Sequence, residues 1–237
     1  CGRSWMKERT DKAMLRSLIR ESQLHNMFTD DTIHEMHLYE AEKGEILCSK
    51  GDQLTQMYFL LTGKIKIFTT SPNGKSLLLR FNNPLAIIGD IEFISHCEVR
   101  NTVEFVHPSL LIGISYKLLQ ERYVNHPPFL QFILQKISHK LYTSSNTTSL
   151  NLLYPVENRF ASYLLSTTSA EQLSAISEEL QTAKLTEIAE LLGTSYRHLN
   201  RVIRNLCAEQ IIERKKGALL IRDRDKIEHL ASGNIYE

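Results

Sequence analysis

LTEIAELLGTSYRHLNRVIRNL, residues 185–206, is the most informative segment of the sequence. Apolar residues recur at helical spacing on both sides of Gly193, so the segment predicts two short helices joined by a tight turn. Ser195 is a suitable N-cap for the second helix, because its hydroxyl can accept a hydrogen bond from the first helical turn. This pattern is typical of a helix-turn-helix, whose second helix enters the major groove of DNA.

The charges of the second predicted helix lie on one side of it. From Gly193 to Leu206 the charged residues are Arg197, Arg201 and Arg204. Their spacings of four and three place them together, away from the apolar seam, where arginines can meet phosphates and guanine edges. The alternative is an ordinary pair of amphipathic helices with a solvated arginine face, and the rest of the sequence decides between the two.

Length and composition indicate a soluble globular protein. The chain has 237 residues, of which 42% are hydrophobic and 23% charged, enough for one large domain or two modest ones. No run of eighteen apolar residues is present, which argues against a membrane-spanning helix. Residues 1–7 lack the apolar core of a signal peptide, and Met6 is expected to be the native start after a remnant of five residues. We therefore expect a cytoplasmic protein with no membrane partner.

Basic residues are concentrated near the predicted helix-turn-helix. The whole chain has a net charge of only +1 at pH 7, which by itself does not indicate nucleic-acid binding. Residues 193–216 nevertheless contain six Arg or Lys against two Glu, a local excess of +4. A small basic face on a neutral body favours a regulator that touches DNA with one domain over a protein that coats nucleic acid.

The cysteines and histidines form no recognisable metal motif. No cysteine belongs to a Cys-x-x-Cys pair or lies near a spaced His pair, so we expect no metal, neither zinc nor an iron–sulfur cluster. The histidines are interpreted as surface or core residues rather than haem ligands, and the isolated cysteines mostly as buried small side chains. The residues concerned are Cys1, Cys48, Cys97, Cys207, His34, His37 and His139.

The N-terminal half is predicted to be rich in short strands. Residues 14–38 have helical apolar spacing, and from Glu40 onward β-rich runs alternate with turn signals such as Pro72-Asn73-Gly74. Many short strands separated by frequent turns indicate a β-sandwich or barrel. The predicted strands cover residues 45–48, 56–61, 64–70, 76–82, 86–89, 100–106 and 110–115.

Several motifs of this half follow, in order, the pattern of the cyclic-nucleotide-binding roll. They are Gly44-Glu45, Gly51-Asp52, residues 58–65, Asn73-Gly74-Lys75 and residues 88–93. With the helix-turn-helix at the other end, residues 28–221 resemble the Crp/Fnr family of transcription regulators. The start of the recognition helix, residues 195–199, is similar to the YeiL-type branch of that family. The order and spacing of the motifs carry the resemblance, since each motif alone is weak.

The resemblance implies an α+β fold in three parts. A double-stranded, jelly-roll-like β-roll is expected over residues 6–125 as a sensor domain, a long dimerisation helix over 126–154, and a winged helix-turn-helix over 155–237. Tyr154-Pro155 supports the last boundary, because the residue before a proline avoids the α-helical region. An enzyme is not expected, since no Gly-rich phosphate loop, nucleophile elbow or metal pair is present.

The predicted long helix begins at Pro127-Pro128 and carries an apolar stripe. Such a stripe favours pairing with the same helix of a second copy, and the resemblance favours a parallel homodimer. Packing of the stripe against the roll is the alternative. The stripe consists of Phe129, Phe132, Ile133, Ile137 and Leu141.

The roll contains most of a phosphate-binding cassette. In ligand-binding members of the family, backbone N–H groups and an arginine hold a cyclic phosphate, and a carboxylate accepts from the ribose. Asp90 is shorter than the usual Glu and Asn101 is bulkier than the usual Ser, so a degenerate pocket or another small effector is favoured over a cyclic nucleotide. The candidate effector residues are Gly89, Asp90, Arg100, Asn101, Thr102, Ser144 and Ser145. The alternatives are an internal ion pair of Arg100 with a roll carboxylate, and an ordinary helix surface for Ser144 and Ser145.

The resemblance also implies which residues meet DNA. Arg201 matches an arginine that the family uses on a guanine, whereas Arg197 stands where many relatives carry Glu, so the usual half-site is not assumed. Residues 211–221 alternate as the hairpin of a wing, with Arg214 placed for phosphates. The candidate DNA-binding residues are Thr186, Ser195, Tyr196, Arg197, His198, Asn200, Arg201, Arg204, Lys215 and Lys216. The expected partners are double-stranded promoter DNA, a second copy of the chain, RNA polymerase and a small-molecule effector.

Other functions of the roll stay open at this point. Cys97 lies beside His96 in a predicted loop, so a redox-sensing thiolate is one alternative, and an unreactive thiol next to Glu98 is the simpler interpretation. A constitutively active regulator with a degenerate pocket is a second alternative. A pure interaction protein with a vestigial roll is a third, against which the intact arginine face argues.

Overall fold

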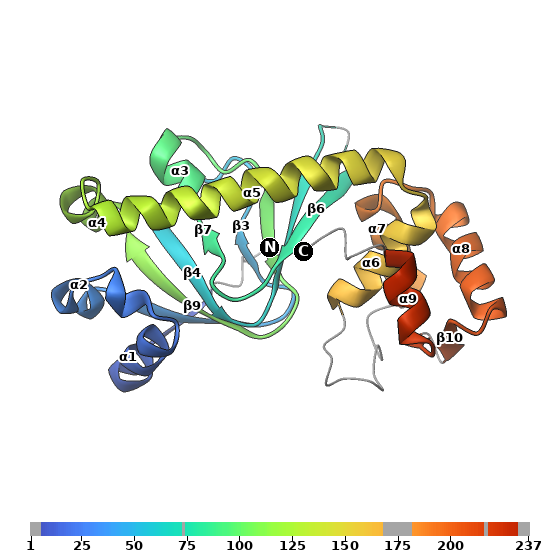
Figure 1. Ribbon diagram of the computed structural model, residues 1–237, viewed down its shortest axis with the longest axis horizontal. Coiled ribbons are helices and arrows are strands. Elements are labelled where there is room, and N and C mark those ends of the chain that lie inside the picture. Colours follow the sequence, from blue (N-terminus) through green and yellow to red (C-terminus); the bar gives the residue numbers. More distant parts are fainter. Residues whose placement is uncertain (1–5, 73, 168–181, 216–217, 232–237) are drawn as a thin grey trace. The chain divides into compact units, whose positions relative to one another are not determined.

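The computed structural model describes residues 6–72, 74–167, 182–215 and 218–231. The chain forms two compact units, which are described separately. The first comprises residues 1–67 and 82–142, and the second residues 68–81 and 143–237. Figure 1 follows the helices and strands of both units along the chain.

Two short helices, a 3-10 turn and a strand open the first unit. They are α1 (Lys12–Glu21), η1 (Leu24–Asn26), α2 (Asp30–His34) and β2 (His37–Ala41). The prediction that helical structure extends to residue 38 is wrong at its end, because Leu38 lies in β2 and pairs with Ile112. Leu38 is only 1% exposed, so its burial in a sheet overrides the helical spacing of the apolar residues before it.

Two sheets form the roll, which confirms the predicted β-roll. Their strands are β1 (Lys7–Arg9), β2, β3 (Ile46–Cys48), β4 (Gln56–Thr62), β5 (Ile65–Thr70), β6 (Ser76–Asn82), β7 (Ile87–Ile88), β8 (Thr102–Phe105) and β9 (Ser109–Ser115). The strand order is β1-β2-β9-β4-β7 in one sheet and β3-β8-β5-β6 in the other. β1 was not predicted, because its three exposed polar residues carry no apolar alternation.

Three further helices follow within or after the roll. They are α3 (Asp90–Ser95), α4 (Tyr116–Arg122) and α5 (Pro127–Leu153). α3 and α4 were not predicted, since helices of six and seven residues are too short to show a clear apolar period. α5 has 27 residues and confirms the predicted long helix, with its part up to Tyr142 in the first unit and the rest in the second.

The apolar stripe of α5 packs mainly against the roll. Phe129 and Ile133 are buried at 0% and 3% exposure among the aromatic and aliphatic core of the first unit, and Phe132 and Ile137 pack partly buried against the same core. Leu141 is the member of the stripe that faces solvent, with 71% of its surface exposed. Packing against the roll, which was the alternative interpretation of this stripe, therefore holds for four of its five residues.

The second unit contains the winged helix-turn-helix. Its elements after α5 are α6 (Val156–Thr167), α7 (Thr182–Leu191), α8 (Tyr196–Ala208), β10 (Ile212–Lys215), β11 (Ala218–Ile221) and α9 (Arg224–Ala231). Helix α5 ends at Leu153 and α6 begins at Val156, so the helical structure is interrupted at Pro155, as predicted. α6 and α9 are joined where the buried Ser162 hydroxyl donates to the Ala231 carbonyl at 3.1 Å and the Asn158 amide donates to the Leu230 carbonyl at 2.7 Å.

Candidate nucleic-acid interface and roll site

The turn between α7 and α8 depends on one glycine. Gly193 has a φ of +62°, a left-handed conformation in which a side chain is unfavourable. The N–H of Thr194 donates to the Ala189 carbonyl at 2.8 Å and that of Gly193 to the Glu190 carbonyl at 2.9 Å. This pair of bonds is a Schellman motif, which satisfies the last carbonyls of α7 and turns the chain. The predicted tight turn at Gly193 is confirmed.

Helix α8 separates an apolar seam from a cationic face. Its start is fixed by Ser195, whose hydroxyl accepts from the His198 N–H at 3.2 Å. Its buried residues are Leu199, Val202, Ile203 and Leu206. The exposed residues include Arg197, Arg201 and Arg204.

The three arginines of α8 keep their charge available. Among the residues that the structure describes, none of Arg197, Arg201 and Arg204 takes part in an ion pair. A guanidinium in water stays protonated and carries five donors in a fixed fork, which suits phosphates and the O6 and N7 atoms of guanine. This face of α8 can therefore interact with an anionic partner.

The other predicted DNA-binding residues differ in exposure. Thr186 and Lys215 are exposed, and Tyr196 is 38% exposed at the first position of α8. His198 and Asn200 are half-buried. Their side chains face internal partners, since His198 Nδ1 lies 3.4 Å from Thr194 Oγ1 and Asn200 Oδ1 lies 3.4 Å from an Arg214 nitrogen. Lys216 lies outside the described residues.

Strands β10 and β11 form the predicted wing. They pair antiparallel, with Ile212 opposite Ile221 and Lys215 opposite Ala218. Arg214 of β10 is exposed and donates to Asn200 of α8. The wing is therefore linked to the same helix that carries the arginine face.

In the roll, the predicted cassette begins at α3. Gly89 precedes it with a φ of +91°, and its carbonyl accepts from the Tyr116 hydroxyl at 2.7 Å. A Cβ at Gly89 would lie 2.6 Å from that hydroxyl oxygen and 3.0 Å from the Gln56 carbonyl oxygen. Both the conformation and the close approach therefore require glycine at this position.

The carboxylate of Asp90 is occupied by a lysine of α5. Lys140 Nζ donates to Asp90 Oδ1 at 2.6 Å and Oδ2 at 2.8 Å, and also to the Ile87 carbonyl at 2.8 Å. The two side chains are 14% and 2% exposed. Sequence reasoning missed Lys140, although it follows Ile137 by three residues and so shares the roll-facing side of α5. A single lysine on that side was indistinguishable from a surface residue.

Arg100 lines a cavity instead of pairing with a carboxylate. Its exposed side chain makes no ion pair among the described residues, and the cavity has a volume of about 770 Å³. Besides Arg100, its lining includes Lys50, Glu92, Cys97 and Tyr116. Burial raises the pKa of the Glu92 carboxyl, and it raises the pKa of the Tyr116 hydroxyl well above its usual range.

The remaining effector candidates lie near the start of β8 and on α5. Asn101 is half-buried before β8, and Thr102, the first residue of β8, is 8% exposed. Ser144 and Ser145 are exposed on the part of α5 that belongs to the second unit. The structure therefore places Asp90 in an internal ion pair and Arg100 at a cavity, and the role of the two serines stays a prediction.

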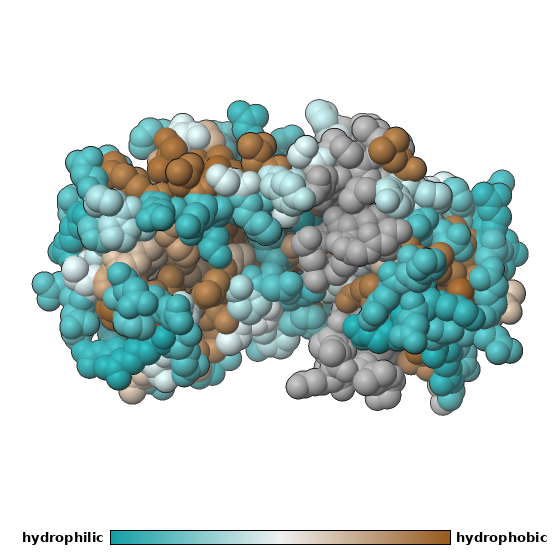
Figure 2. Space-filling model, in the orientation of Figure 1, coloured by the Kyte–Doolittle hydropathy of each residue, from teal (hydrophilic) through white to brown (hydrophobic). Residues whose placement is uncertain are grey.

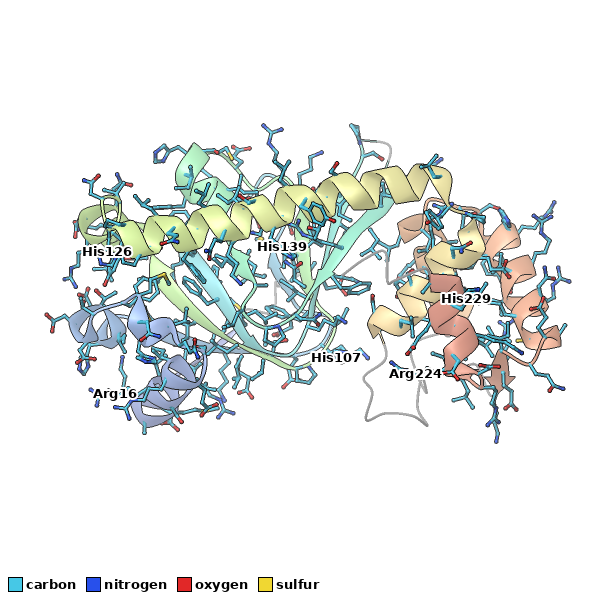
Figure 3. All side chains as sticks on the ribbon, in the orientation of Figure 1. Arg16, His107, His126, His139, Arg224 and His229 are labelled. Carbon is cyan, nitrogen blue, oxygen red and sulfur yellow. The ribbon has the colours of Figure 1, made fainter. Side chains whose placement is uncertain are left out.

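Cysteines and histidines are scattered in the part of the chain that the structure describes. Cys48 is buried, which raises the pKa of its thiol to about 12, and Cys97 and Cys207 are half-buried. His34 Nε2 lies 2.9 Å from an Arg16 nitrogen. His107 lies between β8 and β9, His126 lies directly before α5, and His139 lies within α5 (Figure 3). No group of three or more His, Cys, Asp or Glu among the described residues could hold a metal ion. Within the same residues, no helix is long and apolar enough to cross a membrane.

Two family models match the chain. One is the cyclic nucleotide-binding domain over residues 39–126, and the other is the Crp-like helix-turn-helix domain over residues 158–230. The chain belongs to the Crp/Fnr family of transcription regulators. The predicted family and fold class are thereby confirmed, and the family is one of transcription regulators.

Similar Crp/Fnr proteins align over most of the chain. Regulatory protein YeiL of Escherichia coli O157:H7 is 25% identical over 89% of this chain and 93% of its own length. The cAMP-activated global transcriptional regulator CRP of Pasteurella multocida is 20% identical over 74% of this chain and 85% of its own. In structure, the c-di-GMP responsive regulator CLP of Xanthomonas campestris gives a TM-score of 0.66 at 18% identity, covering 87% of this chain and 98% of its own. A CRP-family regulator of Thermus thermophilus gives 0.65 at 18% identity, with 83% and 97% covered.

The two family-model matches cover some of the candidate residues and leave Lys140 out. The arginine face of α8 lies within the Crp-like helix-turn-helix match, and Gly89, Asp90 and Arg100 lie within the cyclic nucleotide-binding match. Lys140 lies beyond residue 126, outside both matched ranges. The occupant of the Asp90 carboxylate is therefore visible only in the three-dimensional structure.

Proposed function

We propose that this Crp/Fnr regulator binds a pseudo-palindromic promoter site as a homodimer and inserts α8 of each protomer into the major groove. The observation that carries the proposal is the face of Arg197, Arg201 and Arg204, which is exposed and takes part in no ion pair among the described residues. A two-fold symmetric pair of such helices reads two half-sites about one helical turn apart.

Individual residues of this surface take different roles in the proposal. Tyr196, Arg197 and Arg201 lie on the exposed N-terminal half of α8, the end that contacts base edges in helix-turn-helix proteins. Arg201 is assigned to a guanine. The other candidate residues are assigned to phosphates and positioning. They are Thr186, Ser195, His198, Asn200, Arg204, Lys215 and Lys216.

The exposed leucines of α5 support the homodimer. Leu130, Leu134 and Leu141 are 39%, 65% and 71% exposed, and their spacings of four and seven place them along one side of a helix. Figure 2 shows hydrophobic side chains gathered over α3 and the adjacent part of α5, where Ile91 and Ile94 are also exposed. Apolar surface of this kind is stabilised by contact with a second copy. This face shares only Leu141 with the stripe named in the sequence, whose other four residues pack on the roll.

The regulator is further proposed to act in the cytoplasm, to receive a small-molecule effector through the roll, and to work with RNA polymerase at the promoter. The cavity beside Arg100, Glu92 and Lys50 supports an effector site, because it combines both signs of charge with a partly enclosed volume of about 770 Å³.

Selection of bound duplexes from a random DNA library tests the proposed function. With the full chain at about 0.15 M salt and excess non-specific competitor, we expect enrichment of an inverted repeat whose half-site centres lie about 10 base pairs apart. The Arg201→Ala variant should lose preference at one position of each half-site, and Arg16→Ala, on α1 of the other unit, should retain it. Enrichment of no sequence, or of a single unrepeated half-site, would contradict the proposal.

A further inference from the structure

The Lys140–Asp90 contact leaves no donor of the lysine unused. An ammonium group has three protons, and Lys140 Nζ lies within 2.8 Å of three acceptors, namely both Asp90 oxygens and the Ile87 carbonyl. The Asp90 side chain is 2% exposed. This charge-assisted network is complete without any ligand.

A neutral hydroxyl is a poor replacement for this ammonium group. A ribose hydroxyl offers one donor to a carboxylate, whereas Lys140 offers two to Asp90 and keeps its third on Ile87. Displacement of Lys140 would also break the ion pair that its ammonium group, now 14% exposed, makes with Asp90, which costs free energy. The carboxylate is therefore closed to a sugar as long as Lys140 is in place.

We propose that Lys140 is a specificity-determining residue. Its ammonium group binds the Asp90 carboxylate at the start of α3, and it thereby excludes ribose-bearing cyclic nucleotides from that carboxylate. The same contact holds α5 against α3 in the absence of ligand. An effector of the roll then has to bind without using Asp90. The inference concerns ligand choice by the roll and does not depend on the DNA-binding proposal.

Calorimetric titration of the full chain with cyclic AMP tests this inference. The wild-type protein should give no saturable heat up to about 1 mM nucleotide. Lys140→Ser uncovers Asp90 and should bind cyclic AMP at least about tenfold more tightly than the wild type. Adding Asp90→Asn to Lys140→Ser should remove this gain, because the exposed acceptor is then neutral.

Lys136→Ser is the matched control. Lys136 lies one turn earlier on α5, and its Nζ sits 5.4 Å from the Phe132 ring centroid rather than at α3. Its substitution should leave nucleotide binding as in the wild type. Saturable binding of cyclic AMP by the wild type, or a folded Lys140→Ser variant with no gain, would overturn the inference.

Two further measurements keep the inference testable if Lys140→Ser does not fold. Lys140→Gln retains length and an amide donor but no charge, and should also bind cyclic AMP more tightly than the wild type. In the wild-type protein, mass spectrometry after treatment with an amine-acylating reagent should show Lys140 modified more slowly than Lys136, at a rate unchanged by cyclic AMP. Faster acylation of Lys140 with the nucleotide would mean that the ligand displaces it, which contradicts exclusion.

Discussion

The cations of α8 and the lysine of α5 differ in what they bind. Arg197, Arg201 and Arg204 are exposed and make no ion pair within the described residues, whereas Lys140 is 14% exposed and has three acceptors within 2.8 Å. A charge left in water is available to an outside partner, and a charge satisfied internally fills a site that a ligand would otherwise use. The arginine face of α8 is thus accessible to an outside partner, while the Asp90 carboxylate of the roll is occupied by Lys140.

The largest effect is expected where this internal charge is removed. Lys140→Met leaves Asp90 buried without its cation, and should lower the free energy of unfolding by about 3–5 kcal/mol. Urea denaturation of the full chain followed by circular dichroism measures the change. The control Lys117→Met, at a lysine that is 84% exposed on α4, should stay within about 0.5 kcal/mol of the wild type. Equal effects of the two substitutions would mean that the internal pair contributes no more than a surface charge.

Exposed leucines of α5 give the next largest expected effect. Leu134→Glu places a charge on each side of the proposed dimer contact and removes two leucines from it, so dimerisation should weaken by about 3 kcal/mol, roughly 100-fold in Kd. Sedimentation equilibrium measures the monomer–dimer distribution. Glu121→Gln on α4 provides a control at an exposed position. An unchanged dimer in the Leu134→Glu variant would place the interface elsewhere.

Arg201→Ala tests the role of one exposed arginine of α8. Loss of one bidentate contact to guanine should weaken binding to the selected duplex by about 1–3 kcal/mol and relax specificity at one base position. Fluorescence anisotropy with the selected site and with single-base variants of it measures both effects. If the variant kept full affinity and full discrimination, Arg201 would not be the base-reading residue.

Local sequence patterns were sufficient to predict α8 and the roll strands β3 to β9, whereas β1 and β2 were missed. In α8, the apolar residues from Leu199 to Leu206 and the arginines obey one helical period, so burial and exposure follow from spacing alone. The strands are marked by turn signals at their ends, and β6 matches the predicted residues 76–82. The family resemblance then supplied the order of the parts.

The internal ion pair could not be predicted in the same way. Asp90 and Lys140 are 50 positions apart, and each lies in a helix whose local sequence gives no sign of the other. The exposed face of α5 was missed for a related reason, because its roll-facing residues, such as Phe129, and its outward Leu130 and Leu134 are all apolar. Which side of an apolar helix is buried depends on tertiary packing rather than on its period.

The N-cap of α8 should have a moderate effect on stability. Ser195 accepts a hydrogen bond from the His198 N–H, so Ser195→Ala should destabilise the protein by about 1 kcal/mol. Thermal denaturation measures the loss, and Ser195→Asp should restore most of it because aspartate is an equally good cap. If Ser195→Asp also weakened DNA binding at unchanged stability, its new charge would act against a nearby phosphate, which would support the proposed contact.

The smallest expected effect concerns a cation of the wing. Lys215 is exposed at the end of β10, and a lysine on a phosphate carries no sequence information. Lys215→Ala should therefore weaken binding about equally for selected and unrelated duplexes, and reduce the slope of log K against log salt by about one. Titrations at several salt concentrations separate this from the Arg201 effect, which changes discrimination between sequences. A Lys215→Ala variant that lost discrimination instead would show that the wing reads bases, and the division of roles between wing and helix would then be reversed.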